Sequence, residues 1–378
     1  MKNSVTGKPF QTARLTKMWD WMAQEGLSLV MFEDSEANRD QSIRWLCGHP
    51  GDALLFLSVD RKSVLVPWDT NLANAYARAD AIIPYTEFGR RQIDAMKGVI
   101  AFLKVPHGAK IGIPPATPYP QFLNIVGELT DFDIICREKC AAAYARQLRA
   151  IKDDDEIKII RQAADITNEL IDLLEKRIRG EKIKTEADAA LCIELEARKR
   201  GCDGTAFETL AAGPQRSFCI HAFPAWTGEP FAGQGLSILD FGVKLHGYNT
   251  DVTVTFIRDP KPQQEKIVSH VEKAYQLAVA MTENNVPVRK LALAVDLQLE
   301  RYKKAMPHAL GHSIGLEEHE YPVIKVCDTN DLVLEKGMFF SLEPGLYDSV
   351  YGGCRLENDF LMGESGPELL TNARIIYL

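Results

Sequence analysis

The chain has 378 residues, 46% of them hydrophobic and 25% charged, with a formal net charge of −8. This balance is typical of globular proteins, and the length predicts two domains because single cores rarely grow beyond about 250–300 residues. The acidic charge argues against a nucleic-acid partner, and no stretch approaches the ~20 apolar residues of a membrane span. Eight scattered cysteines and a start without an apolar signal segment lead us to expect reduced thiols in a cytoplasmic protein.

The first part of the chain alternates between helical and strand patterns. Helical spacing is visible at residues 14–26 and 93–104, and runs of branched and apolar residues at 27–32, 53–59, 63–68 and 109–113 predict strands. No glycine-rich phosphate loop or dinucleotide fingerprint interrupts this pattern. The alternation predicts a small α/β domain over residues 1–148.

The second part, residues 149–378, combines long amphipathic helices with short strands. Asp153 and Glu156 form a capping-box pattern for a helix that should end at Gly180. Further helices are predicted from Thr185 to just before Gly201, from Pro262 onward, and over 291–305. Strands fill the segments between and after these helices, so the pattern predicts an α+β domain in which two helix pairs back a curved antiparallel sheet.

Five residues of metal-ligand type lie in short apolar or glycine-rich segments of this second part. The segments are SILDFG, YNTDVTVTF, HALGHSIGLEEHE, FFSLEPGLY and GGCRLENDF, and the residues are Asp240, Asp251, His312, Glu343 and Glu357. Burying four carboxylates in such segments is very costly unless cations neutralise them. The pattern therefore predicts a site for two divalent metal ions.

The residues around each candidate ligand predict the strand or turn in which it lies. Strands at 237–243 and 251–257, with Gly247 in the turn between them, would fold back as a hairpin and bring Asp240 close to Asp251. His312 is flanked by glycines, unlike the helical two-histidine zinc motif. Glu343 should end a strand, and Glu357 alternates with Arg355, so both side chains should point to one face.

The donor set is hard and rich in oxygen, which suits Mn²⁺, with Co²⁺ or Zn²⁺ as alternatives, in an open site. Bridging carboxylates would hold two such ions roughly 3.5 Å apart, the separation that two-metal hydrolases use to polarise a carbonyl and deprotonate a shared water.

On these five motifs, in this order, the chain resembles the pita-bread metallopeptidases, the family of prolidase, aminopeptidase P and methionine aminopeptidase, with creatinase as a metal-free relative. The resemblance covers essentially the whole chain. It implies that Asp240 chelates one metal, that His312 and Glu343 bind the other, and that Asp251 and Glu357 bridge the two. It also implies that residues 1–148 form a creatinase-type or prolidase-type amino-terminal domain and that the protein is a homodimer.

Three histidines and one arginine extend the resemblance. His221, His308 and His319 stand where prolidase-like and aminopeptidase P-like members contact the substrate carbonyl or stabilise the tetrahedral intermediate. Arg355 matches an arginine of the same subfamilies, which favours cleavage next to proline. Val254, Thr250 and Asn358 depart from the family pattern, but they are not ligand positions. The other histidines, at 49, 107, 246 and 270, are expected on the surface or in loops.

The resulting hypothesis is a dinuclear exopeptidase that hydrolyses the bond preceding proline in short peptides, an Xaa-Pro dipeptidase. Glu343 would move the proton, while His221 and His319 would hold the substrate oxygens. Arg355 would either hold Glu357 or meet a substrate carboxylate. The alternatives are an Xaa-Pro aminopeptidase, a creatinase-like C–N hydrolase, and a non-catalytic binding protein on the same scaffold. The residue before proline and the physiological peptide stay open.

Overall fold

The structure is a computed structural model that describes residues 9–302, 305–326 and 332–378. The chain divides into two compact units, Met1–Arg149 and Ala150–Leu378. This division falls beside the boundary that the sequence predicts between residues 148 and 149. Within the described ranges, no helix is both long enough and apolar enough to cross a membrane.

Unit 1 contains a six-stranded sheet of order β4-β3-β2-β1-β5-β6, in which β1, β2 and β3 are antiparallel and the other pairs are parallel. The strands are β1 (Leu29–Asp34), β2 (Ala53–Ser58), β3 (Lys62–Pro67), β4 (Ala81–Ile82), β5 (Lys110–Gly112) and β6 (Asp133–Ile135). The helices are α1 (Pro9–Glu25), α2 (Ser42–Cys47), α3 (Thr70–Tyr76), η1 (Tyr85–Phe88), α4 (Gln92–Leu103), α5 (Tyr119–Glu128) and α6 (Ala141–Arg149). The two helices and four strands predicted here are confirmed, with small shifts at their ends.

The main helices of unit 2 begin where their capping residues predict. Asp153 caps α7 (Asp154–Arg179) in a capping box with Glu156, and Thr185 caps α8 (Glu186–Lys199) in the same way. Pro262 opens α9 (Pro262–Met281). The fourth helix, α10 (Val288–Leu299), begins and ends earlier than the predicted range 291–305. A short turn, η2 (Glu300–Tyr302), follows it, and residues 303–304 of the predicted helix lie outside the described residues.

The described strands of unit 2 form four hydrogen-bonded groups where a single curved sheet was expected. Their orders are β11-β10-β7, β20-β12-β9-β8, β14-β13-β15-β18-β19 and β16-β17. The bounds are β7 (Gly204–Thr205), β8 (Leu210–Ala212), β9 (Gly235–Phe241), β10 (Val243–Leu245), β11 (Tyr248–Asn249), β12 (Val252–Arg258), β13 (Gly311–Ser313), β14 (Glu320–Ile324), β15 (Phe339–Leu342), β16 (Gly345–Asp348), β17 (Gly352–Arg355), β18 (Asn358–Gly363), β19 (Gly366–Leu369) and β20 (Ile375–Tyr377). All pairs are antiparallel except β12 with β20.

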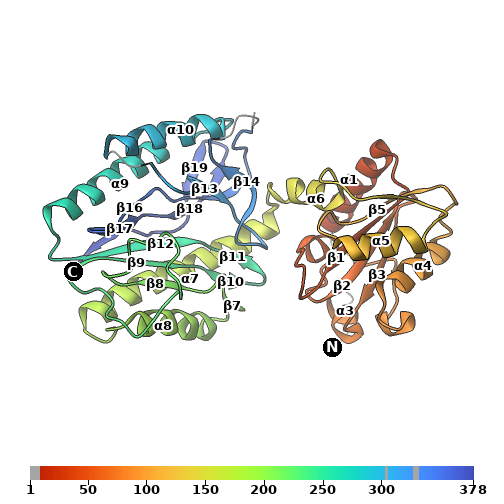
Figure 1. The fold of residues 1–378 in the computed structure, drawn as a ribbon, viewed down its shortest axis with the longest axis horizontal. Helices are drawn as coiled ribbons and strands as arrows, with labels where there is room; N and C mark the ends of the chain where they lie inside the picture. Colours follow the sequence, from red (N-terminus) through yellow and green to blue (C-terminus); the bar gives the residue numbers. More distant parts are fainter. Residues whose placement is uncertain (1–8, 303–304, 327–331) are drawn as a thin grey trace. The chain divides into compact units, whose positions relative to one another are not determined.

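Within unit 2, the helices cover the strands from outside (Figure 1). Helices α7 and α8 contact the strands β7, β8, β10 and β11, while α9 and α10 contact β14 to β17. Apolar side chains from both helix pairs and from the strands form one continuous core. The strands that carry the five candidate ligands, or lie next to them, are therefore packed against the helices through this core.

The predicted pairing of the strands that carry the first two ligands is confirmed. Strands β9 and β12 are antiparallel, with Asp240 opposite Thr253. The connection is longer than a plain turn, because β10 and β11 form a small hairpin of their own around Gly247, whose φ is 86°. Gly242 lets the backbone close at the base of this hairpin, since a Cβ there would lie 1.7 Å from the Thr250 carbonyl oxygen.

Two expectations about individual side chains have different outcomes. The seven described cysteines are all free, as expected, and Cys327 lies outside the described residues. His49 lies in a loop, one of the two placements expected for it, but it is not at the surface, because it is 0% exposed and burial lowers its pKa. The loop after α2 passes close to the ring at Gly51, where an added Cβ would lie 3.6 Å from Nε2.

Replacing Gly242 with alanine should destabilise unit 2, because the added methyl group overlaps a main-chain oxygen that cannot move without opening the hairpin. We expect a loss of about 1–3 kcal/mol in the free energy of unfolding, measured by denaturant titration or calorimetry. Gly228→Ala is the matched control, since a Cβ there meets nothing within 4 Å. Equal stability of the two variants would contradict this account of Gly242.

Candidate metal centre

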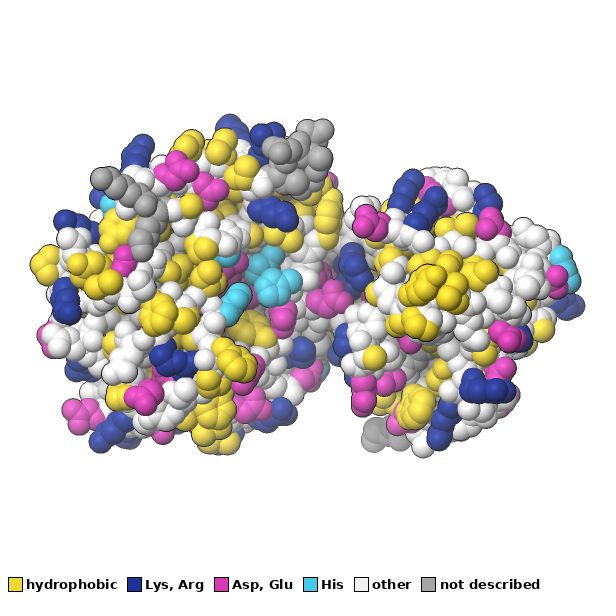
Figure 2. Space-filling model, viewed as in Figure 1, with side chains coloured by type: hydrophobic (Ala, Val, Ile, Leu, Met, Phe, Trp, Pro, Cys, Tyr) yellow, Lys and Arg dark blue, Asp and Glu magenta, His cyan; other side chains and the backbone are white. Residues whose placement is uncertain are grey.

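The five predicted ligands come from five separate segments of unit 2 and meet in one cavity. Asp240 lies in β9, Asp251 directly precedes β12, His312 lies in β13, Glu343 follows β15, and Glu357 stands between β17 and β18. The cavity has a volume of about 400 Å³ and is lined by all five. On the face shown in Figure 2, histidine and acidic side chains gather in a hollow of this unit that hydrophobic side chains border.

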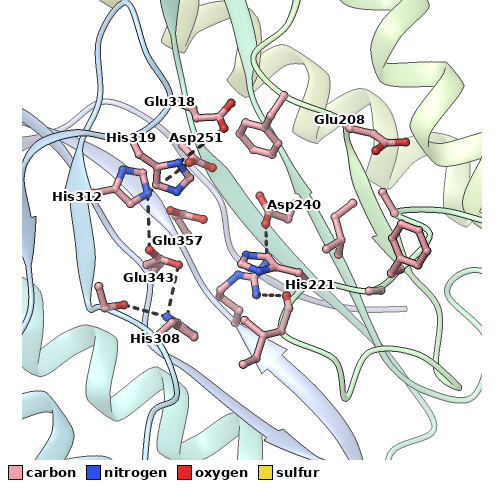
Figure 3. A pocket seen from close by; sticks show the side chains of 18 of the residues that line it. Glu208, His221, Asp240, Asp251, His308, His312, Glu318, His319, Glu343 and Glu357 are labelled. Carbon is pink, nitrogen blue, oxygen red and sulfur yellow. Dashed lines mark hydrogen bonds and ion pairs between the residues drawn. The ribbon is translucent and has the colours of Figure 1, made fainter. Parts of the chain in front are cut away.

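His312 stands at the centre of the ligand group. Its Nε2 lies 3.6 Å from Asp251 Oδ2 and 3.7 Å from Glu343 Oε1. Ligand atoms of Asp251, His312 and Glu357 all lie within 4.8 Å of one another, and these three residues are buried. Figure 3 shows the carboxyl groups of Asp251, Glu343 and Glu357 turned toward the same space beside the His312 ring. Such convergence of imidazole and carboxylate donors is the arrangement that a divalent metal requires.

The carboxyl groups are electrostatically costly without a cation. Burial, followed by the neighbouring charge of Glu357, raises the pKa of Asp251 and of Glu343 well above its usual range. Burial and Asp240 raise the pKa of Glu357 to about 7. Burial lowers the pKa of His312 to about 4, so its ring is neutral, which is the form that binds metals.

Two of the carboxylate oxygens have no hydrogen-bond partner among the described residues, which leaves them available to a metal ion. Among the described side chains, Asp240 Oδ1 and Glu357 Oε1 are buried and have no hydrogen-bond partner. Buried polar atoms are nearly always hydrogen-bonded, so orphaned carboxylate oxygens facing a cavity call for a missing ligand. His312 Nδ1 lies 3.1 Å from the Ser313 carbonyl oxygen, which orients Nε2 toward the carboxylates. These residues therefore suit divalent cations.

Arg355 supports the centre through contacts that the sequence did not predict. Its guanidinium forms an ion pair with Asp240 at 2.5 Å and donates to Tyr347 Oη at 2.7 Å and to the Ile220 carbonyl oxygen at 3.1 Å. Its Nε donates to Thr253 Oγ1, which donates in turn to Glu357 Oε2 at 2.8 Å. Arg355 thus contacts Asp240 directly and Glu357 only through Thr253. Glu357 lies outside the named strands and forms an isolated β-bridge with Thr253.

The three predicted histidines line the same cavity in different surroundings. His308 is held by Tyr347, whose hydroxyl lies 2.9 Å from Nε2, and burial lowers its pKa to about 4. His319 is exposed, and the Glu318 carboxylate, 3.7 Å from Nδ1, raises its pKa. His221 is exposed on the loop that precedes β9. In Figure 3 its ring lies beside Asp240, on the side of the cavity away from His312.

Several residues around the centre escaped the sequence analysis. Tyr347 links His308 to Arg355, Thr253 contacts Glu357, and the buried Asp359 accepts a hydrogen bond from the Asp251 main-chain N–H at 3.0 Å. Tyr347 and Thr253 are common residue types in apolar strands, so no local signal distinguishes them. Asp359 carried a signal, because a buried carboxylate directly before the apolar run FLM is unusual.

Comparison with known proteins supports the same interpretation. Residues 158–364 match the model of metallopeptidase family M24. An uncharacterized peptidase of Methanocaldococcus jannaschii is 31% identical over 61% of this chain, and the alignment covers 66% of that protein, slightly less than two thirds. The Xaa-Pro dipeptidase of Pyrococcus horikoshii is 30% identical over 74% of this chain and 78% of its own length.

The fold is shared with solved structures. The Xaa-Pro dipeptidase of Bacillus anthracis superposes with a TM-score of 0.83, at 22% identity, over 97% of this chain and all of its own. This similarity confirms the predicted α+β pita-bread fold. The family model covers more than half of the chain, including the segments of all five candidate ligands. The chain belongs to metallopeptidase family M24.

Proposed function

We propose that this protein is an Xaa-Pro dipeptidase that hydrolyses the peptide bond before proline in short peptides with two divalent metal ions. The observation that carries the proposal is the meeting of four carboxylates and one neutral histidine in a single cavity of a family M24 chain. The name of the Pyrococcus relative supports the substrate class. Removal of any ligand charge should therefore abolish metal binding before it affects the fold.

Asp240, Asp251, His312, Glu343 and Glu357 are the proposed ligands, with Asp251 and Glu357 shared between the ions. Mn²⁺ is the proposed metal, because hard oxygen donors outnumber nitrogen in this set, and Co²⁺ or Zn²⁺ are the alternatives. When bound, such ions polarise the scissile carbonyl and lower the pKa of a nearby water. The repulsion that raises the pKa of Glu343 and Asp251 would then be relieved, so both carboxylates would be ionised.

The remaining steps belong to the side chains around the ligands. Glu343 is the proposed base, whose carboxylate takes a proton from water and returns it to the proline nitrogen that leaves. His319 is suited to donate a hydrogen bond to the carbonyl oxygen, because Glu318 raises its pKa and lies at Nδ1, which leaves Nε2 for the substrate. His221 and His308 would orient the peptide from the opposite side of the cavity.

Arg355 is better suited to support the ligands than to bind a substrate carboxylate. Its side chain is buried, and its donors are directed at Asp240, Tyr347, Thr253 and the Ile220 carbonyl. A substrate carboxylate would have to displace one of these partners. We therefore assign Arg355 to holding Asp240.

The amino-terminal unit and the assembly are also part of the proposal. We assign residues 1–148 to a creatinase-type domain and expect a cytoplasmic homodimer, as the family resemblance suggests.

A peptide panel assayed with protein reconstituted separately with Mn²⁺, Co²⁺ and Zn²⁺ tests the function. We expect cleavage before proline with Mn²⁺, and faster turnover of an Xaa-Pro dipeptide than of an Xaa-Pro-Xaa tripeptide. A faster tripeptide would identify an Xaa-Pro aminopeptidase. Creatine serves as the negative substrate, and its hydrolysis in place of the peptides would reject the peptidase proposal, as would inactivity with every metal.

Asp251→Asn should lose metal and turnover while the protein stays folded, because the amide cannot supply the shared anionic oxygens. Metal content by elemental analysis and the melting temperature with and without Mn²⁺ measure this. Wild-type protein should be stabilised by the ion and the variant should not, since a ligand that binds only the folded state raises its stability. Asp172→Asn, at an exposed surface aspartate, is the control. Two metals and normal activity in Asp251→Asn would refute the ligand assignment.

His319→Ala should keep its metals and lose about two to four decades in kcat, the usual range for loss of an acid–base or oxyanion partner. Steady-state kinetics on the preferred peptide, together with elemental analysis of the same sample, measure both effects. His107→Ala, at an exposed histidine of unit 1, is the control. Unchanged kinetics would remove His319 from the mechanism.

A further inference from the structure

One wall of the cavity is a long loop, residues 213–230, which we call the His221 loop. Ile220, His221, Phe223 and Ala225 of this loop line the cavity. Phe223 at its tip is 96% exposed, whereas its neighbour Ala222 is buried against Leu210, Ala212 and Ile238. The position of His221 relative to Asp240 therefore depends on this packing and on how the two ends of the loop are fixed.

The two ends of the His221 loop meet in a tight neck. A Cβ on Gly213 would lie 2.1 Å from the Pro230 carbonyl oxygen, so only glycine allows this approach. The second end also pairs with the start of α8, where the Ala187 N–H donates to the Thr227 carbonyl oxygen at 2.9 Å and the Glu186 N–H to that of Glu229 at 3.0 Å. The neck thus lies against the first turn of α8.

A single carboxylate, that of Glu186, ties both ends of the loop together. Its Oε1 accepts the Gly213 N–H at 2.8 Å, and its Oε2 accepts the Thr227 N–H at 2.8 Å and the Thr227 hydroxyl at 2.6 Å. Arg216 also forms an ion pair with Oε2 and donates to the Pro224 carbonyl oxygen beside Phe223. Glu186 is 0% exposed, and its place in the first turn of α8 favours a negative charge.

We propose that Glu186 is a positioning residue for the peptidase reaction: it closes the neck of the His221 loop and thereby holds His221 at the cavity. This inference rests on the proposed function. Glu186 does not line the metal-ligand cavity, so its effect on catalysis is transmitted through the loop. The far side of the loop has its own anchor, because Arg355 donates to the carbonyl oxygen of Ile220, next to His221.

The chemistry of the neck requires a carboxylate in particular. The groups that meet Glu186 are donors on both oxygens: main-chain N–H groups, a guanidinium and a hydroxyl. Glutamine has the same shape but only one acceptor oxygen, and its NH₂ group would face donors. Glu186→Gln therefore releases one end of the neck without leaving a cavity.

The test is a double-mutant cycle between Glu186→Gln and His221→Ala, in full-length protein loaded with Mn²⁺ and assayed on the preferred Xaa-Pro peptide. We expect Glu186→Gln to lower kcat/KM by about ten- to a hundredfold with both metals retained, since small misplacement of a substrate-positioning group has effects of this size. In the His221→Ala background, the same substitution should change kcat/KM less than about twofold, because the two residues act through one interaction.

Glu196→Gln is the matched control. Glu196 lies on the same helix, is also largely buried, and pairs with Arg177, Lys199 and Arg200, but it makes no contact with the His221 loop. It should lower the melting temperature and leave kcat/KM unchanged. Thr227→Val removes the hydroxyl contacts with Glu186 and with the Glu229 N–H but keeps the Thr227 N–H contact with Glu186. It provides a milder variant if Glu186→Gln does not fold, and a smaller loss of kcat/KM that vanishes in His221→Ala is expected.

Hydrogen exchange gives a readout independent of activity. In Glu186→Gln, faster exchange should be confined to residues 213–230, with the Gly213 and Thr227 amides affected first. Equal losses of kcat/KM with and without His221, or unchanged exchange in the loop, would overturn the positioning role while leaving the peptidase proposal intact. Wild-type protein that cleaves no Xaa-Pro peptide would instead contradict the proposed function.

Discussion

Repulsion among four carboxylates in one cavity is the constraint on which the rest of unit 2 depends. Burial raises the pKa of Asp240, Asp251, Glu343 and Glu357, and the charge of neighbouring carboxylates raises it further for Asp251, Glu343 and Glu357. A fold gains no stability from such an arrangement, since buried like charges cost free energy that packing must offset. Divalent cations remove the cost, so the cluster is best understood as a binding site whose strain is relieved by its ligand.

Neighbouring side chains fix the positions of these carboxylates. Arg355 balances one carboxylate, Asp240, and reaches Glu357 through Thr253, while one oxygen of each of these two candidate ligands is buried without a hydrogen-bond partner among the described residues. Glu186 is a buried carboxylate outside the cavity lining, and its hydrogen bonds to Gly213 and Thr227 hold the two ends of the His221 loop. We therefore propose two uses for charge buried in the core of this domain: to bind cations and to set the shape of the cavity wall.

Much of this arrangement could be predicted from the sequence because its signals are local. Capping boxes at Asp153 and Thr185 mark helix starts within a few residues, and a carboxylate or histidine inside or directly beside an apolar strand is conspicuous at positions 240, 251, 312, 343 and 357. The order of these five motifs carried the resemblance that the comparisons with family M24 confirm.

What the sequence could not predict depends on pairing between distant segments. The partner of Arg355 is Asp240, 115 positions away, and alternation along RLENDF suggested Glu357. Arg355 ends β17, and Glu357 lies between β17 and β18, which belong to different sheets. No local feature of the sequence marks this change of sheet. Glu186 looked like an ordinary first-turn acid of a helix, since its partners come from a loop that begins 27 residues later.

Anomalous diffraction from crystals of this protein grown with excess Mn²⁺ tests the central claim most directly. The account predicts two anomalous peaks in the cavity, each within bonding distance of oxygens from Asp251 and Glu357, with His312 Nε2 on one of them. A cavity without peaks, or these carboxylates turned away toward other cations, would contradict it.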